Sequence, residues 1–134
     1  MQALSNILLL IHNLWRWVVV VLLLAAFIKM LIGWVSRSGW GELDTNLTKW
    51  LGMSLGIQFL LGLLVLVLNV VNVGSAYLQS AAVIEHVVSN FIAVILGSLT
   101  FKRAAVTTRF RNKTIALLLA AVFIYRAVAV VGGW

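Results

Sequence analysis

The sequence predicts an all-α integral membrane protein, built as a single bundle of four transmembrane helices over residues 1–134. Two observations lead to this fold class. Hydrophobic residues make up 63% of the 134 residues and charged residues only 10%, with a mean hydropathy of +1.12. The apolar residues also gather in four runs, each close to the roughly 20 residues that a helix needs to cross a bilayer. None of the runs shows the period-two alternation of a barrel strand.

The four spans follow one another along the chain. The first run covers about residues 7–31 and is interrupted by only a few polar residues. The second covers 50–71, after the polar segment GELDTNLTK. The third covers 81–101, between NVGSAYLQS and KRAAVTTRFRNK, and the fourth covers 114–131. Because the linkers are short, we expect consecutive helices to run antiparallel and to pack against each other.

The distribution of basic residues predicts the orientation. The second linker carries no basic residue, whereas the first and third linkers and their flanks carry Lys29, Arg37, Lys49, Lys102, Arg103, Arg109, Arg111 and Lys113. Positive residues favour the cytoplasmic side. We therefore expect the first and third linkers to be cytoplasmic, with both termini outward, in a bacterial cytoplasmic membrane.

Composition also limits the chemistry. The chain has no cysteine, which excludes disulfides, thiolate catalysis and cysteine metal sites. The net charge of +7 lies beside apolar runs, which favours the anionic surface of the lipid bilayer rather than nucleic acid as its partner. No nucleophile stands beside a base, so no self-contained catalytic site is expected. At 14.7 kDa the chain is expected to work with other membrane subunits or as a homo-oligomer.

Several polar residues fall at one depth inside the predicted spans. His12 lies about five residues, or roughly 8 Å, below the outer surface, and Arg16 follows one helical turn deeper. Residues at a similar depth on the third and fourth spans are Glu85, His86, Tyr125 and Arg126, while Gln58 lies near the middle of the second span. An ionisable side chain in such a position costs on the order of 2.5–3.5 kcal/mol, so these groups should meet one another or a ligand.

Charge balance makes an anionic ligand plausible. Glu85 is the one carboxylate available to Arg16 and Arg126, and it can neutralise only one of them. The other guanidinium would need carbonyls, water or an external anion. The sequence therefore predicts a residual positive charge in this part of the bundle.

A b-type haem would use these residues. His12 lies on the first span and His86 on the third, at matched depth, so both imidazoles could bind one haem iron. Arg16 or Arg126 could bind a propionate, and Glu85 or a backbone carbonyl could orient a histidine ring. Three alternatives remain at this stage. The residues could form a polar network without cofactor, a quinone could bind histidine or Gln58, or a chlorophyll-type magnesium could take one histidine.

Three short motifs resemble a family. The segments HNLWRW, GIQFLLGLL and VIEHVV are similar to those of small bacterial four-helix membrane proteins described as cytochrome-b-like. The resemblance spans the chain in layout and matches His12, Arg16, Gln58, Glu85 and His86. It implies a cytochrome that carries electrons through a haem near the outer membrane face. The alternative is a non-catalytic accessory or anchor subunit of a larger respiratory or photosynthetic complex.

Overall fold

The computed structural model describes residues 2–132, which form four long α-helices and one short 3₁₀ helix. The elements in chain order are α1 (Gln2–Ser36), α2 (Glu42–Val73), η1 (Ser75–Gln79), α3 (Ala81–Ser98) and α4 (Val106–Val130). Each α-helix is long and apolar enough to cross a membrane. The prediction of an all-α bundle with four such helices is confirmed.

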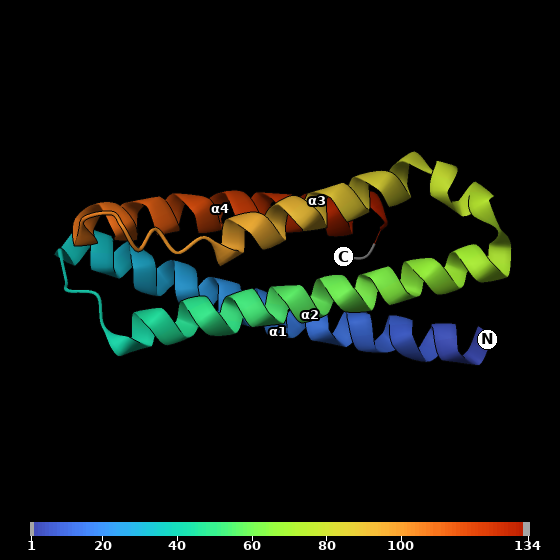
Figure 1. Ribbon diagram of the computed structural model, residues 1–134, viewed down its shortest axis with the longest axis horizontal. Helices are drawn as coiled ribbons and strands as arrows, with labels where there is room; N and C mark the ends of the chain where they lie inside the picture. The colour runs from blue at the N-terminus through green and yellow to red at the C-terminus, as the bar shows by residue number, and fades with distance from the viewer. Residues whose placement is uncertain (1, 133–134) are drawn as a thin grey trace.

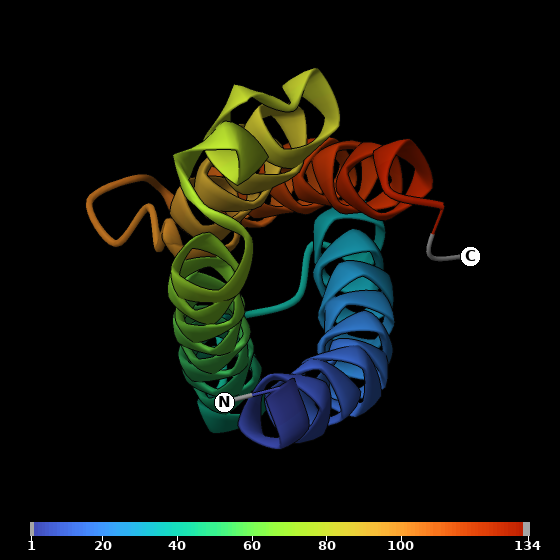
Figure 2. The same ribbon diagram turned by 90° about the vertical axis from the view of Figure 1, so that its right-hand side faces the viewer.

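The helices form a closed ring. α1 packs against α2 and α4, and α3 packs against the same two helices, so α1 and α3 stand opposite each other (Figure 2). Consecutive helices run antiparallel, and the start of α1 and the end of α4 are directed toward the end of the bundle that carries η1 (Figure 1). This arrangement makes the space between α1 and α3 the centre of the bundle.

Small and branched apolar residues fill the centre. On α1 the buried positions recur every three or four residues, which places them on one helical face: Val19, Leu23, Ala26 and Met30. Ala26 on α1 and Ala120 on α4 are fully buried in the same core cluster, and small residues of this kind are common where membrane helices pack. Large apolar side chains also cover the outer surface, where they suit contact with lipid.

Most helices extend beyond the predicted spans, because those spans counted only the apolar runs. α2 begins at Glu42 rather than near residue 50, and the backbone N–H of Gly41 donates to the Asp44 carboxylate at 2.8 Å. The other Asp44 oxygen accepts from Lys29 at 2.7 Å, so the start of α2 is tied to α1. Polar residues therefore extend this helix by capping and pairing rather than by hydrophobicity.

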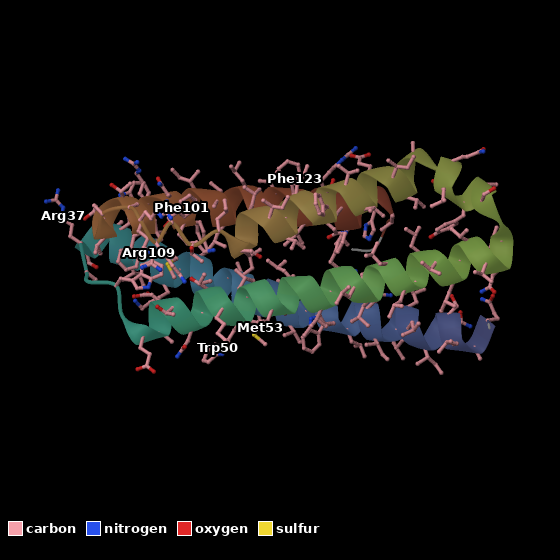
Figure 3. The ribbon with its side chains drawn as sticks, viewed as in Figure 1. Arg37, Trp50, Met53, Phe101, Arg109 and Phe123 are labelled. Atoms are coloured by element: carbon pink, nitrogen blue, oxygen red, sulfur yellow. The ribbon has the colours of Figure 1, made fainter. Side chains whose placement is uncertain are left out.

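α3 is shorter than expected, since it ends at Ser98 instead of near residue 101. The ammonium of Lys113, which is fully buried, donates to the carbonyls of Gly97 and Leu99 and so satisfies the end of the helix. Arg109 stacks 3.5 Å from the centre of the Trp40 ring at the same end. Figure 3 shows Arg109 with Arg37 and Phe101 at this end of the molecule.

Candidate functional site

Two histidines meet across the centre of the bundle. His12 comes from α1 and His86 from α3, the two helices that stand opposite each other. Their ring centroids are 6.3 Å apart and the ring planes are inclined by 68°. Consecutive helices alternate in direction, so α1 and α3 both start at the end of the bundle that carries η1. Residues 12 and 86 therefore reach one level, as counting residues from the outer surface predicted.

The His86 ring is held by two contacts. Its Nδ1 lies 2.5 Å from the backbone carbonyl of Ala127, which can only accept, so Nδ1 carries the proton. Asn90, one turn further along α3, places its amide nitrogen 3.2 Å from His86 Nε2 and donates to the His86 carbonyl at 2.9 Å. The Nε2 atom therefore bears the lone pair, which is the form of imidazole that binds a metal.

The His12 ring has a looser environment. Its Nε2 lies 3.5 Å from the amide nitrogen of Gln58 on α2. Among residues 2–132, the buried Nδ1 of His12 and Oε1 of Gln58 have no hydrogen-bond partner. Gly62 lies against the ring, and a Cβ at that position would come 3.1 Å from His12 Cε1. The absence of a side chain at Gly62 thus makes room for the imidazole, and the polar atoms beside it are available to a ligand.

A cavity of about 320 Å³ surrounds the two rings. This size is within the range of about 300–1,000 Å³ that is typical of small-molecule sites. Aliphatic side chains from all four α-helices form most of the wall. The polar residues of the wall are His12, Asn13, Arg16, Gln58, Tyr77, His86 and Asn90. Arg16, one turn from His12, brings a positive charge to the cavity.

Three residues predicted for the site lie elsewhere. Arg126 donates from Nε to Glu85 Oε1 at 2.5 Å, and the two side chains are 62% and 39% exposed on the outside of the bundle. Tyr125 is 65% exposed. None of the three lines the cavity. Glu85 therefore pairs with Arg126 and not with Arg16, because residues 85 and 126 lie on the outward faces of α3 and α4.

Sequence reasoning missed three contributors to the site. Asn90 could have been found, since it follows His86 by one helical turn and so shares its face. Gly62 and the carbonyl of Ala127 carry no chemical signal in the sequence. Their roles depend on how α2 and α4 pack against the two histidines.

The distance between the two rings is close to the one expected when a single metal ion is held between two imidazoles. With metal–nitrogen bonds of about 2.0 Å, two rings on opposite sides of one ion have centroids about 6 Å apart. The observed separation is 6.3 Å. Among the described residues, no group of three or more histidine, cysteine, aspartate or glutamate side chains could hold a metal. An ion at this position would therefore need further ligands from outside the protein, such as the four nitrogens of a porphyrin.

The other cofactors considered fit less well between the rings. A quinone that bridged both histidines would form one hydrogen bond of about 2.8 Å to each ring. These two bonds alone would separate the ring nitrogens by nearly 6 Å, before the width of the quinone is counted. A quinone could therefore bind one histidine but not bridge both at this separation. A chlorophyll-type magnesium would use one histidine and leave the other without a role.

Comparisons with family models, curated proteins and solved structures found no match for this chain. The resemblance to cytochrome-b-like proteins stays a prediction from the sequence motifs. The site must be interpreted from its own geometry.

Proposed function

We propose that this protein is a small cytochrome-b-like membrane protein, which binds haem b between His12 and His86. In this proposal it carries electrons near the outer face of the bacterial cytoplasmic membrane. The observation that supports it best is the 6.3 Å separation of two imidazoles on opposite helices, with a cavity around both. The cytoplasmic orientation of the basic linkers, which the positive-inside rule favours, puts this level in the outer leaflet.

Each residue of the site has a distinct task in this proposal. His86 would present Nε2 as a ligand, because the Ala127 carbonyl holds the proton on Nδ1. His12 would supply the second ligand from α1. The guanidinium of Arg16 favours an anionic group on its side of the cavity, as a haem propionate would be. The aliphatic wall excludes water, and the bound haem would supply one-electron chemistry.

Specific contacts also favour a second candidate. Both histidines already lie beside an amide, His12 beside Gln58 and His86 beside Asn90. Such a network could set the register of the helices in an accessory or anchor subunit of a respiratory or photosynthetic complex. Interhelical polar contacts of this kind are worth about 0.6 kcal/mol on average. The two candidates differ in whether the purified protein contains haem.

An absorption spectrum of the protein, oxidised and then reduced, tests the proposal. Two axial histidines should produce the sharp visible bands of a low-spin, six-coordinate haem. His12→Ala and His86→Ala should each abolish these bands or convert the iron to high spin, because one coordination position opens. Arg16→Gln should keep the bands and lower the reduction potential, since removal of a nearby positive charge disfavours the added electron.

Tyr125→Phe is the matched control. Tyr125 is a polar residue expected at the same depth as the histidines, but it is 65% exposed and does not line the cavity. This variant should retain the wild-type spectrum. Purified protein without a Soret band, even after haem is supplied during expression, would contradict the haem proposal and favour the polar network.

A further inference from the structure

The outward face of α3 and α4 carries an ion pair. Glu85 and Arg126 are joined by a hydrogen-bonded contact of 2.5 Å between the two helices, and both side chains are substantially exposed. Charged residues in membrane helices are rare, and they almost always face the interior of a bundle or a water-filled cavity. This pair faces away from its own bundle, so its surroundings must come from outside the chain.

Apolar side chains surround the pair on both helices. On α3, Val88 follows Glu85 by nearly one helical turn and is 50% exposed. On α4, Val122 lies one turn from Arg126 and is 57% exposed. We name this surface the α3–α4 face, defined by Ile84, Glu85, Val88, Leu118, Val122 and Arg126. Glu85 lies four residues inside α3, or roughly 6 Å from its start.

We propose that the α3–α4 face binds a second copy of this chain around a two-fold axis parallel to the helices. Both copies then keep the same orientation in the membrane. Such an axis, passing between the two faces, puts α3 of each copy opposite α4 of the other. Because Glu85 and Arg126 contact each other, they lie at one depth, and the rotation about the axis preserves depth. Glu85 of each copy therefore faces Arg126 of the other.

The charge pattern of the face selects a second copy as the partner. One acidic and one basic group lie side by side, so the face is complementary to itself when it is rotated by the two-fold axis. The four charges alternate in sign around a square, and each has an opposite charge both within its own copy and across the interface. Of the three acidic residues in the chain, Glu42 and Asp44 lie at the start of α2, so Glu85 is the carboxylate that can do this. The aliphatic residues along the face pack below this square.

The natural absence of cysteine makes cross-linking a direct test. In the proposed dimer, Val88 of one copy faces Val122 of the other. Two differently tagged chains, one with Val88→Cys and one with Val122→Cys, should form a mixed disulfide when they are co-expressed and oxidised in membranes. The control pairs Val88→Cys with Leu60→Cys, because Leu60 is 61% exposed on α2 and lies outside the α3–α4 face. This control should give no mixed disulfide.

A charge experiment tests the contact across the interface itself. A chain with Glu85→Gln keeps Arg126, and a chain with Arg126→Gln keeps Glu85. A mixed dimer of the two retains one opposite-charge pair across the interface, whereas the matched dimers retain only like charges. Co-expression should therefore give more mixed dimers than random assortment. Random assortment, a monomeric protein in membranes, or equal cross-linking through Leu60 would each overturn the proposal. None of these outcomes depends on haem, so the result stands apart from the proposed function.

Discussion

Substitution of Gly62, which packs against His12, tests directly how the imidazole is held in the site. Replacement of Gly62 by alanine adds a methyl group 3.1 Å from His12 Cε1. The preferred distance between carbon atoms is about 3.5–4.0 Å, so the ring must move by about 0.4–0.9 Å. Gly56 on the same helix is the matched control, because a Cβ there meets nothing within 4 Å.

The two substitutions should change stability in opposite directions. Gly to alanine inside a helix gains about 0.5–1 kcal/mol, and Gly56→Ala should show this gain. Gly62→Ala should show the same gain, but displacement of the buried His12 ring from its packed position should cost about 1–3 kcal/mol. The difference in the free energy of unfolding between the two variants is therefore expected to be about 1–3 kcal/mol.

Unfolding by increasing sodium dodecyl sulfate in mixed micelles, followed by circular dichroism, would measure both values. Movement of the His12 ring should also disturb any haem spectrum in Gly62→Ala but leave it unchanged in Gly56→Ala. Equal stability and equal spectra for the two variants would show that the His12 ring does not rest on Gly62, and would refute the packing described above.

Two further predictions concern the opposite end and the orientation of the bundle. Lys113→Met removes the buried ammonium from the last carbonyls of α3 and should lower the free energy of unfolding by at least about 1.5 kcal/mol, the lower value for a hydrogen bond to a charged group. Lys102→Met, at an exposed position, should change it little, and similar losses in the two variants would contradict the assigned role. A cysteine at Ser75 should react with an impermeant reagent added outside the cell, and a cysteine at Thr107 should not. The reverse pattern would place the histidine pair on the cytoplasmic side.

The level of a residue along the bundle could be predicted well from the sequence. A helix rises by a constant 1.5 Å per residue, so counting from the ends of the apolar runs places His12 and His86 at one level. The structure brings these two residues together. The same reasoning put Glu85 and Arg126 at one depth, and they too contact each other.

The direction in which a side chain points around its helix could not be predicted in the same way. In a soluble helix the apolar stripe marks the face that turns to the core. Here lipid-facing and core-facing positions are both apolar, so the pattern does not distinguish them. That is why Glu85 was expected beside the histidines, although it lies on the outer face with Arg126.

The sequence by itself determined the number of helices, their antiparallel order and the level of the polar residues, because these depend on hydrophobicity and on the length of chain. Only the tertiary structure decided which polar residues share the central cavity. That outcome depends on the rotation of each helix about its own axis, which is set by the contacts of buried core residues such as Ala26 and Ala120 and of the His12 ring with Gly62. These contacts arise from the shape of packed side chains, which residue type and spacing do not encode.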